Sequence, residues 1–159
     1  QLFGLRKCRC GGDVNAAVNN AAPEDVVVRL LEKAEMSGAA ERVKALYRSA
    51  GWIAEEDPAE YIPAMLQNSF CVAGAFHKGR LIGMMRALSD GVSDAYLLDM
   101  VVDPAFRGHG VASRILETIT SHLKNLGIDW IVCISVPGVE KLYLKLGETM
   151  DRHTPIRFH

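Results

Sequence analysis

The apolar positions of the chain recur with two different periods, and each period predicts one kind of element. Apolar residues return every three or four positions over residues 40–50 and 111–126, which predicts two amphipathic helices. Compact apolar runs at residues 70–76 and 81–88, separated by a glycine-containing turn, predict an antiparallel hairpin. The run at residues 95–102 is apolar almost throughout, which predicts a central strand buried on both faces.

Capping residues predict where the helices begin and end. Ser37 is the candidate N-cap of the first helix, and Gly127 is placed to end the longer one. A second, short helix should begin at Asp57, because Pro58 suits the first helical position and Glu60 falls where a capping box needs it.

Further runs complete the order of elements. Strands are predicted at residues 26–34 and 130–135, a short helix at 139–146, and strand-like segments at 148–150 and 155–159. The predicted order is therefore β-α-α-β-β-β-α-β-α-β.

The composition is that of one globular domain. The 159 residues are 49% apolar and carry a formal net charge of −1, so no long-range attraction toward nucleic acid or an anionic membrane is expected. We expect residues 1–25, rich in Gly, Asn and Ala, to form an arm or linker, and residues 26–159 to form the domain. No basic-then-apolar leader and no run of about 20 apolar residues is seen, so a cytoplasmic location is expected. A chain that opens on Gln1 can also be a piece of a longer protein.

The four cysteines favour burial over metal binding. Cys71 and Cys133 lie inside apolar runs, where a free thiol behaves as a small apolar side chain. Cys8 and Cys10 form CRC without a second pair, and this spacing falls short of a zinc signature. No metal site is therefore expected.

The junction between the central strand and the next helix carries the clearest sign of function. Its sequence, VVDPAFRGHG at residues 101–110, ends in two glycines, Gly108 and Gly110, that open the helix. The first backbone N–H groups of that helix lack intrahelical partners and can bind an anion such as a phosphate. Glycine lets the anion's oxygens approach closely, and Arg107 adds a positive charge.

Three alternatives to an anion site of this kind differ in how well the sequence matches them. The Walker signature is excluded, because no glycine here is followed by the required lysine and hydroxyl residue. The dinucleotide fingerprint is met only in its first half, since Ser113 occupies the place of the third glycine and residues 103–107 lengthen the turn. A glycine turn that merely starts a helix is the third interpretation.

Two motifs at this separation resemble those of the GNAT acyltransferases. RGHGVA, residues 107–112, is similar to the family's Q/R-x-x-G-x-G/A signature, and GVEKLYLKLG, residues 138–147, is similar to its second one, a helix with a Tyr followed by Leu-Gly. The element order is also that of the family. The resemblance implies an α/β (α+β) fold, with a mixed, mostly antiparallel sheet of six to seven strands, about four flanking helices and splayed central strands. Glu148 stands where the family usually has Phe.

The resemblance also implies that acetyl-CoA binds across the junction as co-substrate. Main-chain groups of Met100, Val101 and Val102 would bind its pantetheine arm, with the Met100 amide aimed at the acetyl oxygen as a small oxyanion hole. The loop expected to bind its pyrophosphate comprises Arg107, Gly108, His109, Gly110, Val111, Ala112 and Ser113. The His109 side chain is expected to point to solvent.

Tyr143 matches the family tyrosine that protonates the departing sulfur. A phenol of pKa ~10 is protonated at neutral pH and can donate to a thiolate. Tyr143 also lies at helical spacing with Leu142 and Leu146, so a core position stays a competing interpretation.

The residues that would bind the amine acceptor lie in segments whose sequence is less informative. Tyr96, Arg86 and Trp52 are candidate substrate-binding residues, with an ordinary polar surface as the competing interpretation. Asp99 alternates away from Met100 and is expected to be a hydrogen-bonded structural carboxylate. Family members often carry a Glu or His base four residues before the oxyanion amide, which is Tyr96 here, so no side chain is expected to act as a direct base.

The favoured hypothesis is an N-acetyltransferase that moves an acetyl group from acetyl-CoA to a primary amine of a small molecule or peptide, directly and in a ternary complex. The alternative is a non-catalytic acetyl-CoA-binding sensor or regulatory module. Neither nucleic acid nor membrane is an expected partner, and a homodimer is compatible with the sequence.

Overall fold

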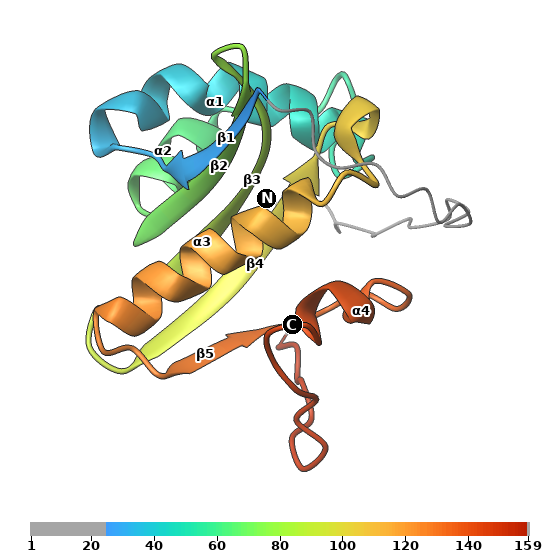
Figure 1. Cartoon of the computed structure of the whole chain (residues 1–159). Helices are drawn as coiled ribbons and strands as arrows, with labels where there is room; N and C mark the ends of the chain where they lie inside the picture. The colour runs from blue at the N-terminus through green and yellow to red at the C-terminus, as the bar shows by residue number, and fades with distance from the viewer. Residues whose placement is uncertain (1–24, 159) are drawn as a thin grey trace.

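The computed structural model describes residues 25–158, which are built around one five-stranded sheet (Figure 1). The strands are β1 (Val26–Leu30), β2 (Cys71–His77), β3 (Arg80–Ser89), β4 (Asp94–Val102) and β5 (Trp130–Cys133), in the spatial order β1-β2-β3-β4-β5. The first four pair antiparallel, whereas β5 runs parallel to β4. The predicted mixed, mostly antiparallel α/β fold is confirmed.

The sheet is smaller than the six to seven strands expected. Residues 148–150 and 155–158 form no strand in the described part of the chain, and the last predicted position, 159, lies outside it. Ile156 and Phe158 are 73% and 89% exposed, so the sheet does not cover this segment. Its first residue, Glu148, offers no apolar side chain that could pack the segment onto the core.

Four helices accompany the sheet: α1 (Lys33–Ser49), α2 (Tyr61–Gln67), α3 (Val111–Asn125) and α4 (Glu140–Tyr143). The α3 bounds confirm the prediction from the apolar stripe. The last predicted helix, 139–146, is shortened to a single turn.

Helix α1 begins before its predicted cap, Ser37, which lies inside the helix. The Glu35 carboxylate accepts a hydrogen bond from the Glu32 amide at 2.8 Å and is held by the Arg29 guanidinium at 2.6 Å. These contacts lower the pKa of Glu35 to about 2, Arg29 contributing most. Because the helix starts there, the first strand ends at Leu30, short of the predicted 26–34.

Helix α2 begins later than predicted. Its N-cap is Glu60, and Asp57 instead closes the preceding loop by accepting a hydrogen bond from the Ala54 amide at 2.7 Å. The side chain that seemed suited to cap a helix therefore caps a turn.

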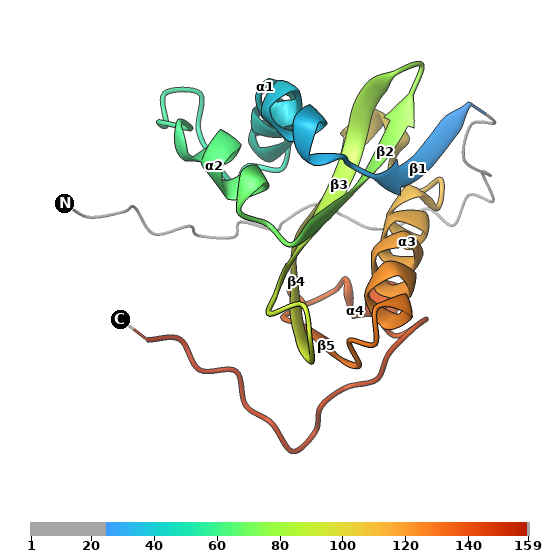
Figure 2. The same ribbon diagram turned by 90° about the vertical axis from the view of Figure 1, so that its left-hand side faces the viewer.

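The helices form two layers about the sheet. Figure 2 shows α1 and α2 on one side of the strands and α3 on the other. The buried stripe of α3 is Val111, Ile115, Leu116, Ile119 and Leu123. It packs against one sheet face, while α1 and α2 bury a second core that includes Val72, Met84 and Val101. Strand β4 thus has a buried layer on each side, as its apolar run predicts.

Within residues 25–158, no helix combines the length and the apolar character that a bilayer span requires.

Candidate active site

Strand β4 contains a bulge at its centre. Met84 of β3 pairs with Val101, but Arg86, two residues on, pairs with Leu98, three residues back. Residues that pair directly lie on the same face of a sheet, so Leu98 and Val101 share a face although they are three apart. The extra residue lies at Asp99, whose φ is 59°. The bulge breaks the strict alternation assumed from the sequence between Met100 and Tyr96.

Strands β4 and β5 separate just before this bulge. Their pairing ends at Leu97 and Cys133, whereas β4 continues to Val102. Residues 98–102 therefore have no β5 partner in the described part of the chain, and this is the splay expected of the central strands. Val101 and Val102 are 4% and 8% exposed, so the side chains of both residues are buried in the core.

The turn after β4 is fixed by Asp103. Its carboxylate accepts a hydrogen bond from the Ala105 amide at 3.1 Å, pairs with Arg80 at 3.0 Å and also pairs with Arg42 of α1. Burial acts to raise the pKa of Asp103, but these partners outweigh it and the pKa lies below its ordinary value. A single 3₁₀ turn, Pro104–Phe106, follows. The junction is therefore rigidly attached to both β3 and α1.

Arg107 and the two glycines lie between this turn and the start of α3. Arg107 donates from Nε to the Val102 carbonyl at 3.0 Å, which ties the loop back to the end of β4. Gly108 and Gly110 have φ of 77° and 74°, a region that favours glycine. The first helical bond runs from the Arg114 amide to the Gly110 carbonyl, so the amides of residues 111–113 have no acceptor among the described residues.

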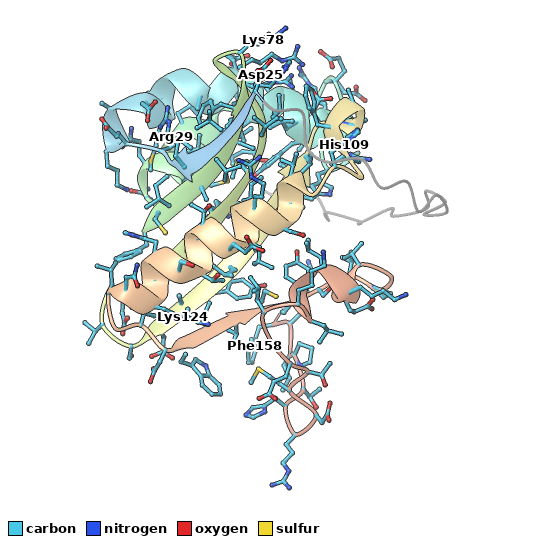
Figure 3. All side chains as sticks on the ribbon, in the orientation of Figure 1. Asp25, Arg29, Lys78, His109, Lys124 and Phe158 are labelled. Atoms are coloured by element: carbon cyan, nitrogen blue, oxygen red, sulfur yellow. The ribbon has the colours of Figure 1, made fainter. Side chains whose placement is uncertain are left out.

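His109 differs from its expectation. Figure 3 labels it at the end of α3 opposite Lys124. The side chain is half-buried, and its Nδ1 atom is shielded from solvent without a hydrogen-bond partner in the described part of the chain. The ring therefore does not simply project into water.

Tyr143 and Lys145 approach this region from the other side. Tyr143 is half-buried and packs against the α3-side core. Burial, and then the neighbouring Cys133 thiol, raise the pKa of Tyr143 to about 12. Lys145 donates from Nζ to the Ser113 hydroxyl at 3.1 Å, which sets its positive charge against the first turn of α3. Sequence reasoning missed Lys145, although it lies inside the second signature.

Two of the three predicted acceptor residues lie within one connected group. The Arg86 side chain is 11% exposed and donates from Nε to Asp99 Oδ2 at 2.5 Å. The Tyr47 hydroxyl donates to the same oxygen at 2.8 Å, and the Tyr47 ring lies 5.0 Å from that of Trp52. The expected hydrogen-bonded carboxylate of Asp99 is confirmed. Tyr47 was foreseen only as an apolar position of α1.

Tyr96 lies on the same strand as Asp99, and the Asp99 charge acts on its pKa. It lines a groove of about 440 Å³ together with Leu88, Asp94, Trp130 and neighbours from the β3–β4 turn. Burial, with Cys133 and Asp99 nearby, raises the pKa of Tyr96, so the phenol keeps its proton at neutral pH. The larger groove, about 520 Å³, lies beside β1 around Arg29 and holds none of the predicted site residues.

The predicted burial of the cysteines is confirmed for Cys71 and in part for Cys133. Cys71 is buried and Cys133 half-buried, both as free thiols, and burial raises the pKa of each. Cys8 and Cys10 lie outside the described residues. Residues 25–158 contain no group of three or more His, Cys, Asp or Glu side chains arranged to hold a metal ion.

Comparison with known proteins gives the class and the family of this chain. The family described as Acetyltransferase (GNAT) family matches residues 30–147. This chain therefore belongs to the GNAT acetyltransferase family.

Individual relatives carry acetyltransferase names. An uncharacterized N-acetyltransferase ycf52 from Gracilaria tenuistipitata var. liui is 31% identical over 113 residues, covering 69% of this chain and 61% of that protein. The histone acetyltransferase TAP1 of Glycine max is 29% identical, covering 77% and 62%. Serotonin N-acetyltransferase 2, chloroplastic, of Oryza sativa subsp. japonica is 34% identical over 46% of this chain and 36% of that one. The chain spans about three fifths of the length of the first two of these relatives.

Solved structures show the same fold. A probable acetyltransferase from methicillin-resistant Staphylococcus aureus superposes with a TM-score of 0.68 at 24% identity, covering 84% of this chain and 99% of that one. A predicted acetyltransferase from Clostridium acetobutylicum, solved with acetyl-CoA, superposes with a TM-score of 0.65 at 16% identity, covering 83% and 96%.

Proposed function

We propose that this chain transfers an acetyl group from acetyl-CoA directly to a primary amine of a small molecule or peptide, in a ternary complex. Two sets of main-chain groups carry the proposal: residues 98–102, which have no β5 partner in the described part of the chain, and the amides of residues 111–113, which have no acceptor among the described residues. These two sets lie at the two ends of one junction, and an extended thioester with a pyrophosphate at one end fits this arrangement. The family membership and the names of the relatives support the same chemistry.

Different groups of the chain bind different parts of acetyl-CoA. The amides that open α3, with the charges of Arg107 and Lys145, hold the pyrophosphate. The main chain of Val101 and Val102, which has no β5 partner among the described residues, binds the pantetheine arm. The Met100 N–H binds the acetyl oxygen, where negative charge develops as the amine attacks.

Bond making and breaking then follow in one transfer. The neutral amine nitrogen attacks the carbonyl carbon, the carbon–sulfur bond breaks, and the leaving thiolate takes a proton from the Tyr143 hydroxyl. A phenol with a pKa of about 12 is protonated at neutral pH, so its proton is in place to donate to the sulfur as negative charge develops there. The amine's surplus proton passes to water, from which Tyr143 is reprotonated.

The remaining assignments are extensions of this proposal. The acceptor is an amine on a small molecule or peptide, and no role for nucleic acid or membrane is assigned. One relative's name places that protein in the chloroplast, so the cytoplasmic location expected from the sequence stays a prediction. Sedimentation of the purified chain will decide between monomer and homodimer.

A panel of amines tests the proposal. Release of the CoA thiol is measured with acetyl-CoA and arylalkylamines, polyamines, aminoglycosides and lysine-containing peptides, beside acetyl-CoA affinity by calorimetry. Acceptor-dependent thiol release, with the acetylated amine confirmed by mass, supports transfer. Tight acetyl-CoA binding without turnover on any acceptor would favour the regulatory module, and absence of binding would refute both.

A further inference from the structure

The bulge of β4 is attached to helix α1 by a buried cluster of three side chains. Oδ2 of Asp99 accepts one hydrogen bond from the Tyr47 hydroxyl, at 2.8 Å, and one from Nε of Arg86, at 2.5 Å. Tyr47 is 0% exposed and Arg86 is 9% exposed. The Asp99 side chain is 13% exposed. We call Asp99, Arg86 and Tyr47 the Asp99 cluster.

The conformation of Asp99 explains why the cluster is needed. Its φ of 59° lies in the left-handed region, which is unfavourable for a residue with a Cβ. Glycine would adopt this φ without that cost, yet an aspartate occupies the position. Its carboxylate supplies what glycine lacks, namely two hydrogen bonds that tie this backbone conformation to β3 and α1.

The next peptide unit contains the group that matters for the reaction. The Asp99 carbonyl and the Met100 N–H belong to one planar unit, so the direction of that N–H follows from the backbone angles of Asp99. Neither Asp99 nor Met100 takes part in a β3 or β5 pair within the described residues. Side-chain contacts, not strand pairing, therefore fix this peptide.

We propose that Asp99, held by Tyr47 and Arg86, is a positioning residue that aims the Met100 N–H at the acetyl oxygen. The inference rests on the proposed acetyl transfer. Asp99 itself touches neither acetyl-CoA nor the acceptor, and with Oδ2 engaged by a guanidinium group it is not the base. A hydroxyl on α1 thereby controls an amide on β4 that is distant in sequence.

The test separates aiming from folding by comparing CoA with acetyl-CoA. CoA lacks the acetyl oxygen, so its affinity should stay within about twofold of wild type in Tyr47→Phe and Asp99→Asn. The same variants should lose the preference for acetyl-CoA, and kcat should fall about 10- to 100-fold, the range for a misdirected oxyanion donor. Ser69→Ala is the matched control. It also removes one buried hydroxyl bond of 2.8 Å, to the Met65 carbonyl, and this bond does not involve β4.

Two further variants keep the test decisive. Asp99→Gly retains access to the positive φ without the carboxylate, so its kcat should also fall; wild-type kcat in Asp99→Gly would overturn the proposal. If Asp99→Asn does not fold, Tyr47→Phe carries the test alone, because it leaves the Arg86–Asp99 pair intact.

The remaining outcomes are distinct. If Tyr47→Phe folds and keeps the wild-type kcat, the cluster has only a structural role and the inference is overturned. The same conclusion holds if, at unchanged kcat, the variant loses affinity for CoA and acetyl-CoA equally. A wild-type chain that neither binds acetyl-CoA nor releases CoA refutes the proposed function itself.

Discussion

The ammonium group of Lys145 lies 3.1 Å from the Ser113 hydroxyl and bridges the segment after α4 to the first turn of α3. The amides of that turn are the ones without acceptors, so the bridge adds a full positive charge to the partial charge of the helix end. The second signature therefore contributes more than Tyr143 to the candidate site.

Replacing Lys145 with Ala should weaken acetyl-CoA binding about 3- to 10-fold, because an exposed lysine–phosphate contact is partly screened by water. The loss should shrink when the salt concentration is raised from about 0.05 to 0.5 M. Calorimetric titration at both salt concentrations measures this. Lys141→Ala is the matched control, since it removes the same charge from an exposed position in α4. Equal effects of the two substitutions would show that only net charge matters.

Three glycines around α3 allow a second matched comparison. Gly108, Gly110 and Gly127 have φ of 77°, 74° and 84°, and a Cβ at any of them meets open space. Substitution by Ala should therefore destabilise each to a similar degree, roughly 1–2 kcal/mol. Only the first two face the expected pyrophosphate, so Gly108→Ala and Gly110→Ala should weaken acetyl-CoA binding at least 10-fold, and Gly127→Ala should not. Thermal denaturation with and without acetyl-CoA gives both quantities, and unchanged affinity in folded Gly110→Ala would contradict the pyrophosphate assignment.

Much of this site could be predicted because its signals are local. Two glycines before a long apolar stripe specify a left-handed turn and a helix start with free amides, whatever the rest of the chain does. The stripe of α3 fixed that helix to within a residue of its observed end, Asn125. Helix α1 was harder to predict, since Ser37 is a good cap in isolation, but the helix begins at a capping box of Glu32 and Glu35, and Glu35 also pairs with Arg29 of β1.

The bulge at Asp99 could not be predicted, because an apolar run buried on both faces looks the same in either register. Only the pairing with β3 shows that Leu98 and Val101 share a face. The ion pair of Arg86 depends on the same register, so its guanidinium, expected near the substrate, donates from Nε to Asp99. The strands predicted from Glu148 onward do not form in the described part of the chain, because a strand needs contacts with the sheet that this segment does not make.

Tyr143→Phe removes the proposed proton donor and keeps the ring. Turnover should fall by roughly 10²–10⁴, while acetyl-CoA affinity stays unchanged, since the hydroxyl serves only the leaving sulfur. If turnover is unaffected, the core position of Tyr143 is its whole role. Steady-state kinetics beside calorimetry decide between these outcomes.

The raised pKa of Tyr143 also predicts a pH dependence of stability. The folded chain holds this proton up to about pH 12, whereas an unfolded tyrosine releases it near pH ~10. The Tyr143 contribution is therefore fully present below pH ~10 and is lost as the pH rises toward about 12. In denaturant titrations over this window, wild type should lose stability relative to Tyr143→Phe as the pH rises, and parallel curves would contradict the assignment.

The last prediction concerns the missing general base. The position four residues before Met100 holds Tyr96, whose raised pKa leaves it without a free base form at neutral pH, and Asp99 is engaged by Arg86. The acceptor must then lose its proton to water or arrive neutral, so kcat/KM for an alkyl amine should climb with pH toward the amine's own pKa. Two amines of different pKa should give limbs displaced by that difference. Tyr96→Phe, which alters only the groove beside β4, should change KM for the acceptor more than kcat. An acidic limb that stays near about pH 6 to 7 for both amines would reveal an ionisable base and overturn this prediction, with Asp94 as the first candidate to replace.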